Sequence, residues 1–433
     1  MLLFFIVKNY RSFKDEAVID MEAVGLSDHK DCLLHYRKKS FLPVISINGK
    51  NGGGKSNVIR AFWLATQFIN NAQRSQHETA EVPVTPFELN DYSRNEPTSF
   101  EFEYTNDGIW FRYGFSATRK QITQEHLYWA PNGQKSIVFQ RYFQDFVFPS
   151  NSEKKNKELI SKAVGTNQLF FAVSCTMNYE PCIKAMKWFR EKVVFSKKYS
   201  DFGSSIFEYR EDPEMLKSVL ENIKKADLGI SDMKFEFDNK TLSDVKELLN
   251  NLHTDAKKQI TNALLQFKNS LSANSGNYLE NVQYNDLKTT LYHIGLNSKG
   301  EKKEYPLNLS DESDGTIRLM ALAIAIGSAI KNGGILFIDD IEDKLHPKIV
   351  EYIINRFQKN NQNDSQLIFT THSVDIMNRE LLRRDQLYLV DKNELSGTSS
   401  LYSVADLSVR NDEKIGKSYL LGKYGAIPHI QEK

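Results

Sequence analysis

Residues 1–21 and 98–129 alternate apolar and polar positions with a period of two, the pattern of β-strands with one buried face. The first stretch contains LLFFIVKNYRSF and then AVIDM, and it predicts an opening hairpin. The second stretch alternates on both sides of Asn106-Asp107-Gly108, a sequence typical of tight hairpin turns. We therefore expect part of the fold to be an antiparallel sheet.

Other stretches have the three-to-four-residue spacing of amphipathic helices. Two of them are residues 57–73, NVIRAFWLATQFINNAQ, and a region that includes residues 182–195, CIKAMKWFREKVVF. The longest is residues 241–267, which opens with a T-x-x-D capping pattern and has an apolar stripe. This stripe fits a helix packed on the body and a protruding arm or dimer contact equally well. The polar segments 150–157 and 270–277 predict connections.

Three short apolar runs, Val44–Ile47, Ile335–Ile338 and Leu367–Phe369, predict buried strands. Each run is followed by glycine-rich or polar residues. In open α/β sheets, ligands bind at this carboxyl end of the strands. Together with the helical stretches, the three runs predict an α/β fold with a ligand site at one edge of a sheet.

The first run leads into INGKNGGGKSN, which fits the pattern G-x-x-x-x-G-K-[ST] from Gly49 to Ser56. Glycines let the backbone wrap closely around an anion, and the next helix presents its positive N-terminal end. We expect Lys55 to bind the β- and γ-phosphates of a nucleoside triphosphate, and the Ser56 hydroxyl to hold Mg2+. The expected nucleotide contacts in this loop are Gly49, Asn51, Gly52, Gly53, Gly54, Lys55, Ser56 and Asn57.

The other two runs deliver charged and titratable residues. In LFIDDIEDKLHP, Asp339 is expected to bind Mg2+, and Asp340 is expected to orient the attacking water or accept its proton. The third run ends in Thr371-His372-Ser373, where His372 can reach a γ-phosphate. A histidine at a strand end is by itself more often structural. The phosphate loop and the acidic pair favour a catalytic role for His372.

The sequence Ser313-Asp314-Gly315-Thr316 stands before an apolar helix. Ser or Asp at this position caps a helix N-terminus. The same geometry, with a serine hydroxyl, a small glycine and exposed N–H groups, binds a γ-phosphate. The two interpretations are compatible. A helix end this far along the chain can face the phosphate loop of a second subunit, and a small-molecule kinase has no use for it.

The order KNYRSF, NGKNGGGKSN, ESDGTIRL, LFIDDIEDKLHP and TTHS resembles the ABC-type ATPases of the SMC/RecF and OLD-like group. Within that group, the chain is similar to AAA-family ATPases of bacterial anti-phage defence, the AbiLi/RloA-like and PtuA-like proteins. The likeness includes FRYGF, KADLGISD and YLLGKYGAIP, and it covers most of the chain except residues 240–300. It implies an ABC-type P-loop ATPase head, in which a mixed sheet is joined to an antiparallel β subdomain, with a helical insertion.

The resemblance also implies a head-to-tail homodimer, or a higher homo-oligomer, that encloses two ATP molecules. Ser313 and Gly315 then act in trans on the partner's nucleotide, and His372 is the switch histidine. Leu345-His346 would lie at the dimer seam. The segment KNYRSF, which contains Arg11, would lie near the adenine.

The chain departs from this group in two places. The group has Glu after the Mg-binding Asp, whereas this chain has Asp340, one methylene shorter. General-base catalysis is sensitive to reach, so we expect slow turnover, or a role that passes partly to Glu342 or to water. The glutamine of the Q-loop has no assigned position, and Gln121, Gln124 and the region near Phe87 are its candidates.

Charge, cysteine content and the length of the apolar runs indicate which kinds of protein this chain resembles in composition. The 56 basic and 55 acidic residues leave a net charge of +1, so the overall charge does not favour binding to nucleic acid. Nucleic acid stays a candidate partner through a local basic patch. The three cysteines lack C-x-x-C spacing, which fits packing residues in a reducing compartment. The apolar runs are too short to cross a membrane. We expect a soluble, cytoplasmic protein without a membrane partner.

The expected organisation has three parts. These are an N-terminal lobe of the ATPase head at residues 1–149, a helical insertion at 150–300, and a C-terminal lobe at 301–433. OLD nucleases carry a Toprim domain after the histidine loop, whereas about 60 residues follow His372 here, so a nuclease or toxin effector is expected on another chain. The leading hypothesis is an ATP-hydrolysing defence switch. The alternatives are a RecF-like DNA-repair clamp and an ATP-gated scaffold with little hydrolysis.

Overall fold

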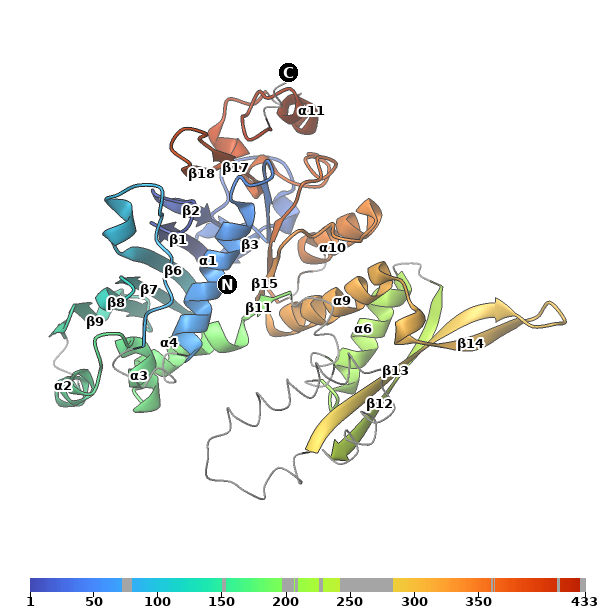
Figure 1. Cartoon of the computed structure of the whole chain (residues 1–433), viewed down its shortest axis with the longest axis horizontal. Coiled ribbons are helices and arrows are strands. Elements are labelled where there is room, and N and C mark those ends of the chain that lie inside the picture. The colour runs from blue at the N-terminus through green and yellow to red at the C-terminus, as the bar shows by residue number, and fades with distance from the viewer. Residues whose placement is uncertain are drawn as a thin grey trace, which may run out of the picture. The chain divides into compact units, whose positions relative to one another are not determined.

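The computed structural model of the chain describes residues 1–71, 80–149, 153–196, 206, 209–225, 229–241, 283–359, 361, 363–410 and 413–428 (Figure 1). They belong to two compact units. One consists of Met1–Lys197 with Ala325–Lys433, and the other of Lys198–Ile324. The fold is mixed α/β, with an antiparallel and a mixed sheet, as the sequence patterns predict.

An antiparallel sheet forms one layer of the first unit, and in the described residues it has seven strands in the order β10-β9-β8-β7-β6-β1-β2. The opening hairpin is confirmed, because β1 and β2 pair from Val7 with Ala17 to Phe4 with Asp20. The strands are β1 (Leu2–Lys8), β2 (Ala17–Asp20), β6 (Thr98–Asn106), β7 (Ile109–Ala117), β8 (Ile122–Ala130), β9 (Ser136–Tyr142) and β10 (Asp145–Val147).

The turn between β6 and β7 is the tight hairpin that the sequence predicts. Asn106 pairs with Ile109, which leaves a two-residue loop. Both loop residues are left-handed, with φ of 48° at Asp107 and 77° at Gly108. This conformation matches the twist of the flanking strands, and an Asp-Gly pair tolerates it well.

A mixed sheet forms the second layer, in the order β11-β15-β16-β5-β17-β18. Its pairs are parallel except for β17 with β18. Because β5, β15 and β16 are buried throughout and parallel, their carboxyl ends lie at one edge of the sheet. The strands are β5 (Val44–Asn48), β11 (Val193–Phe195), β15 (Ile335–Ile338), β16 (Gln366–Thr370), β17 (Leu387–Lys392) and β18 (Ser399–Ser403), and a separate hairpin has β3 (Leu34–Tyr36) and β4 (Lys39–Phe41).

Helices join the two sheets. Helix α1 contacts β1 of the antiparallel sheet and β16 of the mixed sheet, and α4 likewise contacts β6 and β11. The ring of Phe62 on α1 lies 4.8 Å from that of Phe5, and 4.3 Å from that of Phe337 between ring centroids. The helices of this unit are α1 (Lys55–Asn71), α2 (Lys154–Lys162), α3 (Phe170–Thr176), α4 (Glu180–Glu191), α10 (Pro347–Lys359) and α11 (Ile415–Leu420).

The helical prediction for residues 182–195 is wrong at its end. Helix α4 stops at Glu191, and Val193–Phe195 pair in parallel with β15 as strand β11. Two consecutive valines favour an extended backbone. The edge of β15 supplies hydrogen-bonding partners for the backbone of Val193–Phe195. Periodicity alone did not reveal this switch.

The second unit contains a three-stranded antiparallel sheet as well as helices. Its strands are β12 (Ile230–Thr241), β13 (Gln283–Leu296) and β14 (Lys302–Asn308). Helix α6 (Pro213–Lys225) contacts β12, and α9 (Asp314–Asn332) begins in this unit. Met215, Ile223, Leu291 and Met320 are among the buried residues of its core. Apart from Thr241, which ends β12, the helix predicted for residues 241–267 lies outside the described residues.

Short 3-10 segments lie at Lys30–Cys32, Ser93–Asn95, Leu309–Asp311, Arg384–Gln386 and Val404–Asp406. Cys32, Cys175 and Cys182 are buried and form no disulfide. Within the described ranges, no helix is both long and apolar enough to cross a membrane.

Candidate nucleotide site

The loop Gly49–Ser56 connects β5 to α1, as the phosphate-loop pattern predicts. Its backbone packs closely against β17 and β18. A Cβ at Gly49, where φ is 149°, would lie 2.4 Å from the carbonyl oxygen of Val390. A Cβ at Gly54, where φ is 118°, would lie 2.7 Å from the hydroxyls of Ser12 and Ser399. Only glycine fits these two positions, so the loop path depends on them.

The side chain of Lys55 is buried and bends back over the loop. Its Nζ donates to the carbonyl oxygen of Gly49 at 2.8 Å and to that of Lys50 at 3.2 Å. Burial lowers the pKa of Lys55, and the charges of Asp340, Glu342 and Asp339 oppose this shift. The ammonium is therefore held where the loop N–H groups and an anion would meet.

The acidic pair follows β15 directly. Asp339 Oδ1 accepts a hydrogen bond from the Thr370 hydroxyl at 2.6 Å, and the Asp340 N–H donates to the same hydroxyl oxygen at 2.8 Å. Thr370 is fully buried at the end of β16, so it fixes both aspartates to the neighbouring strand. Burial and the charge of Asp339 raise the pKa of Asp340.

The backbone of Asp340 is left-handed, with φ of 49°. Asp is more common than Glu in this region of backbone space, because its short side chain tolerates it. Asp at this position, which departs from the Glu that the sequence resemblance leads us to expect, therefore has a local structural reason. The sequence pattern alone did not show it.

His372 lies at the end of β16 and faces both charged groups. Its Nδ1 is 3.3 Å from Lys55 Nζ, and its Nε2 is 3.8 Å from Asp340 Oδ1. The N–H of the preceding Thr371 donates to the carbonyl oxygen of Ile47 at 3.1 Å, which ties the histidine loop to the strand before the phosphate loop. The structure thus brings Lys55, Asp339, Asp340 and His372 together at one sheet edge.

The opening segment lies beside the phosphate loop. The Ser12 hydroxyl accepts a hydrogen bond from Asn57 Nδ2 at 2.9 Å. Arg11 is left-handed, with φ of 48°, and its N–H donates to the carbonyl oxygen of Thr85. Its Nε donates to the Tyr10 hydroxyl at 3.1 Å. This places KNYRSF next to the first turn of α1.

Sequence reasoning missed several residues that support the loop. The Ser399 hydroxyl donates to the carbonyl oxygen of Gly53 at 2.5 Å, and Lys50 Nζ lies 3.7 Å from both Asp391 and Glu394. These partners come from β17, β18 and the turn between them, more than 300 residues after the loop. Only the three-dimensional pairing of β5 with β17 reveals them.

The Ser313 sequence belongs to the second unit and caps α9. The Thr316 N–H donates to the Ser313 hydroxyl at 3.1 Å, and the two hydroxyls are 2.9 Å apart. Ser313 is exposed, and Gly315 lies in the first helical turn. Within this chain, Ser313 therefore caps the N-terminus of α9, and its side chain stays exposed.

A protein-family model described as "AAA domain, putative AbiEii toxin, Type IV TA system" matches residues 44–378. The match covers more than half of the chain. The chain belongs to this AAA-domain family. It is therefore an ATPase of the AAA type by family, and the match includes the phosphate loop, the acidic pair and His372.

The AAA-domain chain is also similar to two solved structures. One is titled "Crystal structure of the SmcHead bound to the C-winged helix domain of ScpA", with 12% identity, a TM-score of 0.41, and coverage of 93% of this chain and 97% of that chain. The other is an SMC head domain from Thermotoga maritima, with 14% identity, a TM-score of 0.40, and coverage of 94% and 99%. No curated protein matches the chain.

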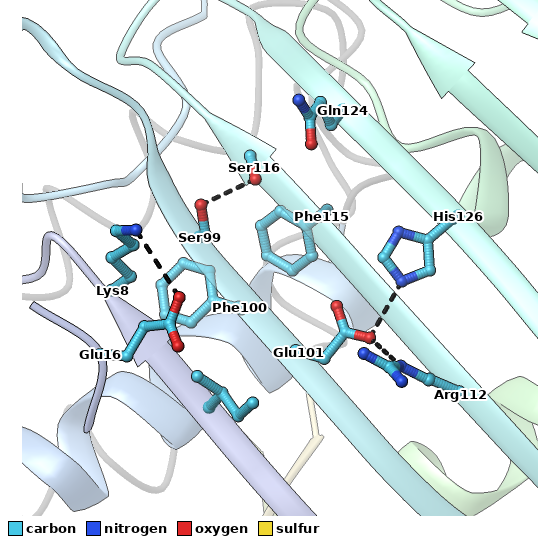
Figure 2. A pocket seen from close by; sticks show the side chains of 11 residues that line it. Lys8, Glu16, Ser99, Phe100, Glu101, Arg112, Phe115, Ser116, Gln124 and His126 are labelled. Carbon is cyan, nitrogen blue, oxygen red and sulfur yellow. Dashed lines mark hydrogen bonds and ion pairs between the residues drawn. The ribbon is translucent and has the colours of Figure 1, made fainter. Parts of the chain in front are cut away.

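A separate pocket of about 370 Å3 lies on the antiparallel sheet, where residues of β1, β6, β7 and β8 line it (Figure 2). Glu101 Oε1 lies 2.5 Å from Arg112 Nε and 3.1 Å from His126 Nε2, and Lys8 Nζ lies 3.6 Å from Glu16. Since these charges are paired with one another, the candidate site of this AAA-domain chain is the sheet edge with the phosphate loop.

Proposed function

We propose that this chain is an ATP-hydrolysing switch or sensor subunit of a bacterial anti-phage defence system. The observation that carries the proposal is the meeting of Lys55, Asp339, Asp340 and His372 beside the loop Gly49–Ser56. ATP closes a dimer in this proposal, and hydrolysis or a phage cue reopens it. The family description, which names a putative toxin of a toxin–antitoxin system, supports a setting of this kind.

The donors at the site suit ATP with Mg2+. The Ser56 hydroxyl and the Asp339 carboxylate are oxygen ligands of the type that Mg2+ prefers. In the described part of the chain, no group of three His, Cys, Asp or Glu side chains is arranged to hold a metal by itself. Mg2+ usually keeps waters and shares phosphate oxygens, so two protein ligands are sufficient. When bound, Mg2+ would neutralise charge on the β- and γ-phosphates.

Each remaining residue has a role in the proposed reaction. Lys55 binds the β- and γ-phosphates, and Asp340 orients the attacking water or accepts its proton. His372 contacts the γ-phosphate and registers its presence. Each of these side chains approaches at least one of the others in the first unit, so a single chain supplies this half of the site.

The other half is proposed to come from a second copy. An exposed helix N-terminus with a capping hydroxyl suits the γ-phosphate, and Ser313 and Gly315 provide one on α9. Leu345-His346 would lie at the seam between copies. Because ADP lacks the γ-phosphate that both halves contact, hydrolysis would loosen the dimer.

The composite site is tested by mixing two inactive variants. Lys55→Ala removes the phosphate-binding lysine, and Ser313→Arg blocks the helix end. We expect each variant alone to lose ATP turnover, and a verified mixed assembly to recover part of it, because one intact composite site remains. If the wild type turns over ATP and the mixed assembly stays inactive, the head-to-tail arrangement with independent sites is wrong.

The helix-end role is separated from simple capping by a matched pair. Asp and Asn both cap helices as well as Ser does. Ser313→Asp and Ser313→Asn should therefore unfold at similar denaturant concentrations. If α9 binds a γ-phosphate, the added negative charge in Ser313→Asp should lower turnover at least about tenfold below that of Ser313→Asn. Equal turnover would restrict Ser313 to its structural role.

The defence role is tested in cells that carry the chain with its neighbouring genes. We expect phage protection to be lost with Lys55→Ala and retained with Glu16→Ala, which removes only an exposed ion pair. Unchanged protection with Lys55→Ala would refute ATP dependence. A wild type that binds ATP without turnover would favour an ATP-gated scaffold, for which the short Asp340 gives a reason. ATP-strengthened, salt-sensitive binding to duplex DNA would favour the RecF-like clamp.

A further inference from the structure

Glu342 links the acidic turn to the histidine loop. The N–H of the fully buried Ile341 donates to the carbonyl oxygen of Thr370 at 3.1 Å, which fixes the turn to the end of β16. The next residue, Glu342, accepts a hydrogen bond through Oε1 from the backbone N–H of His372 at 2.5 Å. A side chain of one loop therefore holds the backbone of the other.

The second oxygen of this carboxylate is unusual. Among the described residues, Glu342 Oε2 is buried and has no hydrogen-bond partner. A buried carboxylate oxygen without a partner costs free energy. The contact to the His372 N–H uses only Oε1, so a neutral side chain of the same shape can also make it.

The His372 ring is exposed, whereas the backbone that carries it is held by a hydrogen bond to Glu342. The ring is 43% exposed, so packing holds it only weakly. The neighbouring N–H groups are bound elsewhere, that of Thr371 to the carbonyl oxygen of Ile47 and that of Ser373 to the Thr371 hydroxyl. Glu342 is the partner of the His372 N–H itself. Loss of this bond would release the one residue of the loop that faces both Lys55 and Asp340.

We propose that Glu342 is a positioning residue, which holds the His372 backbone so that its imidazole stays between Lys55 Nζ and Asp340. Its importance for turnover rests on the proposed ATP hydrolysis, whereas the hydrogen bond itself is present without nucleotide. The proposal assigns Glu342 this backbone contact and no proton transfer.

The first test measures amide hydrogen exchange of the full chain without nucleotide. The variants are Glu342→Ala, Glu342→Gln, which retains an acceptor oxygen, and Glu380→Ala as an exposed control. In Glu342→Ala, we expect exchange at His372 to accelerate about ten- to hundredfold, the range for a lost hydrogen bond to a charged group. Glu342→Gln and the control should stay near the wild type, and exchange in β6 and β7 should be unchanged in every variant.

The second test separates binding from turnover. In Glu342→Ala, we expect kcat to fall about ten- to hundredfold while affinity for a fluorescent ATP analogue changes less than about threefold, because a misplaced His372 affects the reaction more than binding. Glu342→Gln should restore most of kcat. If Glu342→Gln protects the His372 amide but loses as much kcat as Glu342→Ala, the charge matters rather than the position, and the proposal is wrong.

The two tests fail independently. Unchanged exchange at His372 in Glu342→Ala overturns the positioning role whether or not the chain hydrolyses ATP. A wild type without turnover overturns the proposed hydrolysis, and the exchange measurement then still decides whether Glu342 holds the histidine loop.

Discussion

Two polar clusters of the first unit differ in how their charges are matched. In the pocket on the antiparallel sheet, Glu101 contacts Arg112 and His126, so its carboxylate has close positive or hydrogen-bonding partners (Figure 2). At the edge of the mixed sheet, the charges of three carboxylates, Asp339, Asp340 and Glu342, act on the buried ammonium of Lys55. The carboxylate of the first cluster is paired within the sheet, whereas the carboxylates of the second outnumber the ammonium beside them.

The backbones of the clusters differ in the same sense. The pocket lies on regular strands, where Glu101 pairs with Gly114 and Gly114 pairs with His126. The edge contains the left-handed Asp340, with φ of 49°, and Gly49 and Gly54, with φ of 149° and 118°. Unmatched charge and strained backbone cost stability, so their persistence at one place indicates function. A polar pocket with neither feature is a solvated sheet face.

The largest expected difference between the clusters comes from removing one charged side chain of each. Lys55→Ala should lower ATP turnover about 10²–10³-fold, the usual loss when one donor to a reacting phosphate or oxyanion is removed. Glu16→Ala removes an exposed ion pair with Lys8 and should leave turnover within about twofold. Steady-state phosphate release checks both variants. A similar loss in both would mean that the pocket and the edge act together, and the comparison would fail.

The length of the side chain at position 340 is the next feature that distinguishes the edge from the pocket. Asp340→Glu adds one methylene to the side chain, and we expect kcat to rise about tenfold, since general-base catalysis depends strongly on distance. The left-handed backbone should make this variant less stable by about 1 kcal/mol. Asp340→Asn should lower kcat. Turnover rates and urea unfolding check these effects, and a fall of kcat in both variants would show that reach is not the limit.

Sequence patterns predicted the charged residues of the sheet edge, but they did not predict the residues that hold those side chains and the loop in place. The buried runs, the phosphate loop and the acidic pair lie where their spacing places them, because each depends on neighbours in sequence. Thr370 and Ser399 contact the site through pairings between distant strands, which no local pattern encodes. The strand Val193–Phe195 was missed for the same reason, since its partner β15 lies about 140 residues further along the chain.

Two glycines test whether the phosphate loop is more than a turn. Gly52 and Gly108 are both left-handed, with φ of 71° and 77°, and a Cβ at either meets no atom within 4 Å. Alanine at each should therefore cost about 1 kcal/mol of unfolding free energy from backbone strain alone. Only Gly52→Ala should also weaken ATP binding, about tenfold for one lost backbone contact. Calorimetric titration with a non-hydrolysable analogue checks this, and equal affinities would remove Gly52 from the site.

The smallest expected effect is in the cluster on the antiparallel sheet, and its pH dependence shows what holds it together. Burial opposes ionisation of Glu101, but the hydrogen bonds from His126 and Arg112 outweigh it and lower its pKa below the ordinary 4.5. The ionised carboxylate therefore stabilises the fold above that value, and the stabilisation is lost as pH falls through the lowered pKa. Arg112→Gln should cost about 0.5 kcal/mol at pH 7, because the arginine is largely exposed, and the variant and wild type should converge in acid. Urea unfolding at several pH values checks this. A difference that persists in acid would instead point to the contact of Arg112 with the Phe4 ring, 5.4 Å from its centroid, and the cluster would then be held by packing rather than by matched charge.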